Sequence, residues 1–235
     1  MERLRLVLLR PRNADNLVAV ARAMKNFGAS DWVIVSPNPN LLEAPGLNRL
    51  AVKAFDVLEQ VRLVPTLAEA VADCTWVVGT TSRAIEGRRR LWPGEVAEHR
   101  AGLEGTTALV FGDERSGLTN DDVALCHHVS AIPTADAQPS LNLAQAVVVY
   151  LYALATAGGA TQRPPGPKLA SHEQVARVSR LLGEHLAAGG FVDAAGESHV
   201  DTLVAPWTRA HLTDVEARQW ESALRVMAKK AGRGS

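Results

Sequence analysis

The chain has little of several features that mark specialised classes of protein. Its 235 residues include two cysteines, Cys74 and Cys126, which are too few for a disulfide framework and typical of a reducing compartment. Neither charge is in excess, because 25 Lys and Arg residues balance 25 Asp and Glu residues. A global basic field that binds nucleic acid is therefore excluded, and any such binding must come from local patches.

Long hydrophobic runs are also missing. The longest, over residues 146–157, is too short to cross a bilayer, and the run Leu6–Leu9 is closed by Arg10, which argues against a secretory signal. We therefore expect a cytoplasmic protein that does not attach to a membrane. A content of 47% hydrophobic and 21% charged residues is ordinary for a globular chain and excludes wholesale disorder.

Short β-branched runs alternate with helical stretches. Strands are expected over 5–9, 32–36, 75–79, 107–112 and 129–133, and helices over 16–28, 67–73, 93–100, 119–127 and 141–157. The strands are nearly continuous apolar runs, which indicates helices on both faces of the sheet. The pattern predicts an α/β domain with a mostly parallel sheet flanked by helices. The helix over 141–157 is apolar nearly all round, so it is either a core helix or one shared with a second copy of the chain.

A change of composition divides the chain. Residues 161–168 are rich in proline and glycine and predict a linker after a first domain over 1–160. In the remainder, residues 169–235, capping boxes at Ser171 and Thr213 each precede an amphipathic pattern. We expect a small helical extension that docks on the first domain or on a partner.

The residues that could carry chemistry follow the expected strands, in the loops 79–83, 112–117 and 132–142. Ligands of open parallel sheets bind outside the carboxyl ends of the strands, where these loops lie. The loop 112–117 has the glycine spacing of a phosphate-binding loop, but Leu118 replaces the lysine and two acidic residues would repel a triphosphate. We therefore reject a nucleoside triphosphatase. A loop whose glycines only satisfy turn geometry remains the alternative to a ligand site.

Metal-ligating and basic residues also occur in local clusters. The Cys-His-His run at 126–128 does not predict a metal site, because adjacent side chains do not converge on one ion. Two basic segments, 1–30 and 83–90, would form a phosphate-binding groove if they share a face, and are otherwise solvated surface. Arg22 stands out because it lies among small residues in a helical stretch, where an arginine tends to lean over a cleft.

Three motifs together resemble a known family. Residues 16–28, 109–120 and 132–146 are similar, in order, to the three motifs of the SPOUT superfamily of RNA methyltransferases. The likeness points to the TrmH/SpoU branch and its TrmJ-like group of tRNA ribose 2′-O-methyltransferases. It covers about residues 4–158, and the tail around 209–216 also resembles the extension of that group.

The resemblance implies a C-terminal trefoil knot within the α/β domain and a homodimer. It also implies S-adenosylmethionine as cofactor, no metal, and methylation of a ribose 2′-hydroxyl in RNA, with tRNA as the favoured substrate. Methylation of rRNA and an RNA-binding module without turnover are the alternatives. Matching catalytic positions are Arg22, Asn16, Glu114, Ser140 and Asn142. Matching cofactor positions are Thr80, Thr81, Ser82, Gly112, Ile132, Pro139, Ser140 and Leu141. RNA contacts are expected from Arg12, Arg22, Arg83 and Arg115.

Individual residues carry further expectations. A guanidinium barely deprotonates in proteins, so we expect Arg22 to bind phosphate and the developing alkoxide rather than to act as a base. Glu114 could hold Arg22, the cofactor amine or an RNA hydroxyl, and Ser140 could also cap the long helix. Asp113 stands where the family frequently has arginine, a loss of positive charge for which Arg115 could compensate.

Overall fold

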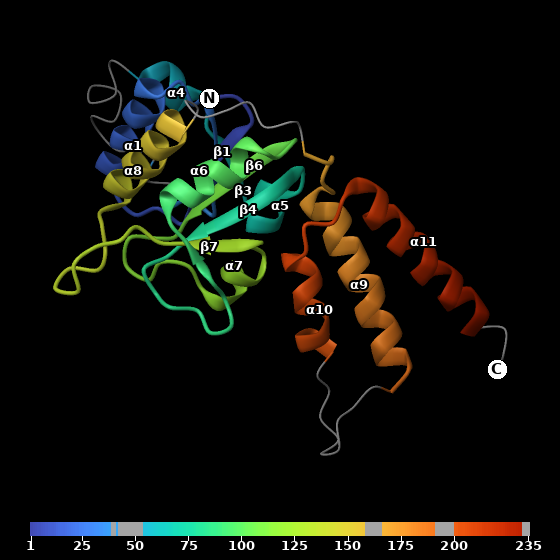
Figure 1. Cartoon of the computed structure of the whole chain (residues 1–235). Helices are drawn as coiled ribbons and strands as arrows, with labels where there is room; N and C mark the ends of the chain where they lie inside the picture. Colours follow the sequence, from blue (N-terminus) through green and yellow to red (C-terminus); the bar gives the residue numbers. More distant parts are fainter. Residues whose placement is uncertain (39–40, 42–53, 158–165, 191–199, 232–235) are drawn as a thin grey trace.

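A parallel sheet forms the centre of the molecule (Figure 1). The computed structural model describes residues 1–38, 41, 54–157, 166–190 and 200–231. Within them, a 7-stranded sheet has the order β3-β2-β1-β6-β4-β7-β5, with every neighbouring pair parallel. The strands are β1 (Leu4–Leu9), β2 (Asp31–Val35), β3 (Arg62–Val64), β4 (Cys74–Thr80), β5 (Arg90–Leu91), β6 (Thr106–Phe111) and β7 (His128–Ser130).

Helices cover both faces of this sheet, as Figure 1 shows. One face carries α1 (Ala14–Asn26), α4 (Phe55–Glu59), α6 (Pro93–Ala101) and α8 (Leu143–Thr156). The other face carries α5 (Leu67–Val71) and α7 (Asn120–Ala124). The α/β fold with a parallel sheet, expected from the alternation of apolar runs and helical stretches, is confirmed.

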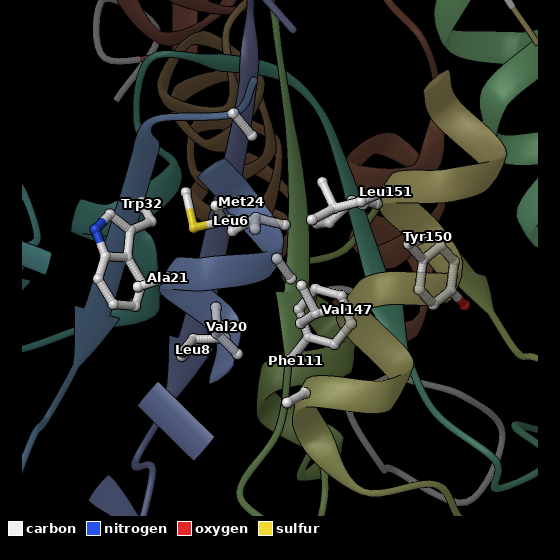
Figure 2. Packing of buried hydrophobic residues seen from close by; sticks show 14 of the residues in the cluster. Leu6, Leu8, Val20, Ala21, Met24, Trp32, Phe111, Val147, Tyr150 and Leu151 are labelled. Carbon is white, nitrogen blue, oxygen red and sulfur yellow. The ribbon is translucent and has the colours of Figure 1, made fainter. Parts of the chain in front are cut away.

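The core follows from the two-residue period of the strands. All six side chains of β1 are buried. Leu4, Leu6 and Leu8 enter one hydrophobic cluster, and Val7 and Leu9 enter the cluster on the opposite face. In Figure 2, Leu6 of β1 packs beside Met24 of α1, and Phe111 at the end of β6 lies beside Val147 of α8. A strand covered on both faces is apolar at most of its positions, which is why these runs do not alternate.

The boundaries differ from the expected ones where tertiary contacts intervene. Helix α7 is shorter than the expected 119–127, because the backbone N–H of His127 donates to Val77 O at 2.9 Å and draws the chain into the sheet. Strand β7 ends at Ser130 rather than at Pro133, whose nitrogen has no hydrogen to donate. Strands β3 and β5 and helix α4 were not predicted, because they are too short for their hydrophobic residues to repeat with a recognisable period.

The long apolar helix α8 is buried on one side only. Val147 and Leu151 are fully buried, whereas Val148 is 41% exposed and Tyr152 is 61% exposed. Helices α1 and α8 pack against each other. The inner face of α8 is therefore part of the core, as expected for a core helix. Its outer face is apolar and uncovered in a single chain, as expected for a helix shared with a second copy.

Three C-terminal helices pack together beside the sheet domain (Figure 1). They are α9 (His172–Ala188), α10 (Val200–Arg209) and α11 (Asp214–Ala231). The expected capping boxes are present, since Ser171 accepts from the N–H of Gln174 and Thr213 from the N–H of Glu216. The unit docks on the first domain, where the N–H of Glu173 donates to the carbonyl of Ala72 at 3.1 Å.

Of the expected linker over 161–168, residues 161–165 lie outside the described residues. No helix within the described ranges is long and apolar enough to cross a membrane.

Substitution of Met24 by alanine tests the packing of α1 on the sheet. Met24 is fully buried, so Met24→Ala removes contacts and leaves a cavity that should lower the free energy of unfolding by about 2–5 kcal/mol. Its neighbour Lys25 is exposed and paired with Asp56, so Lys25→Ala should cost less than about 1 kcal/mol. Urea denaturation of both variants measures the difference, and equal losses would contradict the packing.

Candidate active site

Three strands end at the same level of the sheet and open a cavity. Thr80 at the end of β4 is in register with Phe111 of β6 and with Ser130 of β7. The loops that follow these strands enclose about 300 Å³, at the small end of the range for ligand sites. All eight residues expected to bind a cofactor line this cavity: Thr80, Thr81, Ser82, Gly112, Ile132, Pro139, Ser140 and Leu141.

The loop after β6 is folded tightly on itself at one wall of the cavity. The N–H of Gly117 donates to the carbonyl of Asp113 at 2.9 Å, and Gly117 has a φ of +67°, which favours glycine. A Cβ on Gly112 would collide with the carbonyl of Gly117 and the nitrogen of Leu118. Both glycines are therefore required by the backbone of the loop, which keeps this wall close to the strand end.

Asp113 organises the same loop from within. Its Oδ1 accepts from the backbone N–H groups of Arg115 and Ser116 at 2.8 and 2.7 Å, and its Oδ2 accepts from the Ser116 hydroxyl at 2.5 Å. Burial alone would raise the pKa of Asp113, but these hydrogen bonds and the charge of Arg12 outweigh it and lower the pKa to about 2. Asp113 is therefore ionised at neutral pH, and its negative charge is stabilised by groups of its own loop and by Arg12.

A chain of hydrogen bonds joins three distant segments beside the cavity. The side-chain N–H of Asn142 donates to Asn16 Oδ1 at 2.9 Å, and the side-chain N–H of Asn16 donates to Glu114 Oε1 at 2.8 Å. The other carboxylate oxygen of Glu114 accepts from the backbone N–H of Arg12 at 2.9 Å. Three of the expected catalytic residues thus lie together, and each fixes the orientation of the next.

Asn142, rather than Ser140, caps the long helix. Its side-chain oxygen accepts from the N–H of Ala144 at 2.9 Å and of Gln145 at 3.4 Å. The alternative role of Ser140 as the cap is not realised, because α8 begins at Leu143 and Ser140 lies too far before that first turn. Ser140 is exposed and lines the cavity instead.

The inner end of the cavity contains a buried chain of hydroxyls that the sequence analysis missed. The Tyr150 hydroxyl donates to Ser130 Oγ at 2.8 Å, and Ser130 Oγ donates to the carbonyl of Leu91 at 2.8 Å. The carbonyl of Ser130 accepts from the N–H of Thr81 at 2.8 Å. Ser130 thus joins β5, α8 and the loop after β4, and Figure 2 shows Tyr150 on α8 in the same packed region as Phe111.

Sequence signals for these inner residues were weak. Tyr150 is one of two tyrosines in the chain, and a hydroxyl in an otherwise apolar helix must find a buried partner. Burial raises the pKa of Tyr150, so the phenol remains protonated and can donate. The partner, Ser130, lies at a strand end and has no distinguishing pattern.

The Thr80 hydroxyl already has a protein partner. It donates to the carbonyl of Val110 at 3.0 Å and so ties β4 to β6. Thr81 Oγ1 accepts from the N–H of Arg83 at 3.1 Å. The two threonines therefore shape the loop, and only their remaining hydrogen-bonding capacity faces a ligand.

The expected RNA-binding arginines take different positions. Arg83 and Arg115 line the cavity, and Arg12 is more than half exposed, with its Nε 3.5 Å from Asp113 Oδ1. Arg12, not Arg115, therefore faces the charge of Asp113. Arg22 is exposed on α1, does not line the cavity, and forms no hydrogen bond or ion pair with any described residue, so the suggested Glu114–Arg22 contact is not formed in a single chain.

Several charges of the two basic segments are used for structure. Arg5 is buried and pairs with Asp31 and Asp73, whose carboxylates lie 2.9 and 2.5 Å away. Arg10 pairs with Asp122 at 2.6 Å. Arg88 donates to two backbone carbonyls, both at 2.9 Å. The segments 1–30 and 83–90 therefore offer fewer cations to a phosphate than the sequence suggested.

Within the part of the chain that the structure describes, no three His, Cys, Asp or Glu side chains have an arrangement that could hold a metal ion. Cys126 is fully buried, and its thiol donates to the carbonyl of Asp122 at 3.3 Å. His127 Nδ1 accepts from the backbone N–H of Val77 at 2.9 Å. The two side chains thus serve the core and the sheet.

The fold and the cavity define a parallel α/β protein with a ligand site at the carboxyl edge of its sheet. Residues 3–152 match the family model of the SpoU rRNA methylase family, and the chain belongs to this family.

Relatives and solved structures agree with this assignment. The chain is 39% identical to the uncharacterized tRNA/rRNA methyltransferase LasT of Escherichia coli K12, over 66% of this chain and 68% of LasT. It is 36% identical to the tRNA (cytidine/uridine-2′-O-)-methyltransferase TrmJ of Klebsiella pneumoniae, over 82% of both chains. The crystal structure of TrmJ from Z. mobilis superimposes with a TM-score of 0.80 at 31% identity, covering 95% of this chain and 98% of that one.

Substitution of Gly112 tests the wall of the cavity. The added methyl group of Gly112→Ala meets backbone atoms that cannot rotate away, so the loop must shift. We expect the dissociation constant for S-adenosylmethionine, measured by calorimetry, to rise by more than about tenfold. The matched control is Gly94→Ala, where the new methyl group meets open space. Unchanged binding in Gly112→Ala would show that the ligand does not use this wall.

Tyr150→Phe tests the inner hydroxyl chain. Loss of one buried hydrogen bond should raise the KM for S-adenosylmethionine about three- to tenfold, while kcat at saturating cofactor stays within about twofold. Thr75→Val is the control, because it also removes one hydroxyl hydrogen bond, from Thr75 Oγ1 to the carbonyl of Glu104, but Thr75 does not line the cavity. A KM unchanged in both variants would leave the phenol without a role at this site.

Proposed function

We propose that this chain transfers the methyl group of S-adenosylmethionine to a ribose 2′-hydroxyl of tRNA. The observation that carries the proposal is the convergence of three separate loops on one cavity at the carboxyl edge of the sheet. Membership of the SpoU family and likeness to TrmJ proteins support it. The family description names rRNA, so rRNA is the second candidate substrate.

The inner end of the cavity suits an uncharged, partly aromatic part of a ligand. This end is formed by Phe111, Leu143 and Tyr150, and the rim of the cavity carries hydroxyl and backbone groups, which fits a nucleoside held by shape and hydrogen bonds. The cradle at Gly112, which a Cβ would fill, lets a ligand approach the backbone closely. The residues that would hold the cofactor are those of the three loops.

The protein must align a hydroxyl with the methyl group and stabilise charge on its oxygen. When bound, S-adenosylmethionine supplies the electrophilic methyl group. The hydrogen-bonded chain Asn142–Asn16–Glu114 supports the proposal that these side chains are preorganised to orient the ribose hydroxyl, because each is held in place by its neighbour. Arg22 would bind the RNA phosphate and the developing alkoxide, since its guanidinium stays charged.

A homodimer is part of the proposal. Arg22 does not line the cavity of its own chain and has no partner among the described residues. On the neighbouring α8, Val148 and Tyr152 form an uncovered apolar surface. A second copy packed on α1 and α8 would cover that surface and bring Arg22 to the cavity of the other protomer. The expected knot and a cytoplasmic location belong to the same proposal.

The RNA would lie over the mouth of the cavity. Arg83 and Arg115 line the cavity and Arg12 lies exposed beside it, which supports contacts with phosphates near the reacting ribose. The C-terminal helices would extend this surface or the dimer.

A methyl-transfer assay tests the function directly. The full chain should transfer the label of S-adenosylmethionine carrying a tritiated methyl group to tRNA. It should not transfer label to rRNA fragments, and a control without RNA should give no labelled product. Nuclease digestion of the product should release the label on a ribose 2′-oxygen. Label on rRNA alone would move the assignment to the second candidate, and no label with any RNA would reject the enzyme.

Arg22→Ala and Arg22→Lys separate binding from chemistry. If Arg22 stabilises the developing charge, the single-turnover rate of Arg22→Ala should fall about 10²- to 10³-fold with bound RNA, and Arg22→Lys should recover part of it. Loss of RNA affinity with an unchanged single-turnover rate would contradict this role.

Mixed dimers then test whether Arg22 acts in trans. At S-adenosylmethionine concentrations below the raised dissociation constant of Gly112→Ala, each of the variants Arg22→Ala and Gly112→Ala should have reduced activity when assayed alone. A mixture should regain activity, because one cavity in each mixed dimer has both an intact wall and an arginine from its partner. No recovery in a mixture shown to exchange subunits would place Arg22 and its cavity in the same chain.

A further inference from the structure

Five of the seven histidines in the chain meet at the junction between the sheet domain and the C-terminal helices. His99 comes from α6, and His127 and His128 from the start of β7. His172 begins α9, and His211 lies between α10 and α11. The cluster lies at the start of β7, opposite the strand ends that form the cavity, so the proposed reaction does not use it.

His211 is the centre of this histidine cluster. Its ring centroid lies 5.1 Å from that of His99, 5.0 Å from that of His128 and 5.7 Å from that of His127. The Nε2 of His99 and the Nδ1 of His211 are 3.4 Å apart. A side chain of the C-terminal unit is thus inserted among three histidines of the sheet domain.

Three contacts in the cluster need a histidine nitrogen that carries no proton. His128 Nδ1 accepts from Trp76 Nε1 at 3.1 Å, and His127 Nδ1 accepts from the backbone N–H of Val77 at 2.9 Å. The contact between His99 and His211 needs at least one nitrogen without a proton. A protonated imidazole donates from both nitrogens and accepts at neither, so protonation of His128 or His127 removes its contact, and protonation of both His99 and His211 removes theirs.

The surrounding charges oppose protonation. The electrostatic neighbours of His127 and His128 are other histidines together with Arg88 and Arg89, and Arg209 lies close enough to act on Arg88. Burial, with these positive neighbours, lowers the pKa of His128 and of His211 to about 4. It also lowers the pKa of His127 and of His172.

An open groove of about 410 Å³ lies between α7 and α9 at the junction, and His172 and Ser179 line it. The buried Ser179 Oγ and His211 Nε2 have no hydrogen-bond partner in the described structure. Unpaired buried polar groups gain water when the junction opens, so local opening costs less here than elsewhere in the core.

We propose that the histidine cluster is an acid-sensitive latch, whose neutral rings hold the C-terminal helices on the sheet domain and whose protonation releases them. A histidine freed from the junction has its ordinary pKa of about 6.5, so the open state binds more protons than the docked state at mildly acidic pH. Docking is therefore fully favoured above about pH 6.5 and weakens as the pH falls toward about 4.

Hydrogen–deuterium exchange of the full chain tests the latch. Corrected for the intrinsic pH dependence, amide exchange in α9 and α11 should rise at least about tenfold between about pH 7.5 and pH 5, because each titrating histidine favours the open state. Exchange in β1 and β6 should stay constant, which separates local release from global unfolding. No increase in α9 and α11, or an equal increase in β1 and β6, would overturn the proposal.

Two variants connect the effect to the cluster. His211→Phe keeps a ring of similar size that cannot be protonated, so its acid-induced exchange should be reduced at least about threefold relative to the unmodified chain. His185→Gln is the control, because His185 contacts Leu224 O within the extension, outside the cluster. Identical acid responses in His211→Phe and the unmodified chain would overturn the latch. The readout needs no RNA or cofactor, so its failure is distinct from failure of the proposed methyl transfer.

Discussion

The register of three parallel strands is the constraint on which the candidate site depends. Thr80, Phe111 and Ser130 end neighbouring strands at one level, so the loops that follow must emerge side by side. The hydrogen bonds from β4 to β6 and to β7 set this alignment, and the apolar side chains on both faces of the sheet hold it. Polar residues far apart in the chain therefore share a cavity, because each of them follows one of these aligned strands.

A second layer of interactions makes that edge rigid. Asn142 caps α8, and the same side chain holds Asn16 of α1, which in turn holds Glu114 of the loop after β6. Helix capping and site geometry are thus properties of one amide. Asp113 stands where the family frequently has arginine. Its negative charge is stabilised within its own loop, because its carboxylate accepts from the backbone N–H groups of Arg115 and Ser116.

A cluster of basic residues in the sequence does not show which of these side chains will be exposed on the surface. Arg5 and Arg88 belong to basic segments, yet both are held inside by carboxylates or carbonyls. Arg22 belongs to the same first segment and is left unpaired among the described residues, in contact with solvent. The histidines show the reverse case, since residues scattered from α6 to the α10–α11 connection meet at one junction.

The amino-acid sequence by itself determined the parallel α/β class, the loops that carry the site and the capped helices at Ser171 and Thr213. These features depend on local periodicity and on contacts between near neighbours. It could not predict the short strands β3 and β5, the Tyr150–Ser130 pair, the true cap at Asn142 or the partners of Asp113. Each of those depends on a hydrogen bond or a strand pairing across the fold, and only the packed tertiary structure decides which distant groups come within reach.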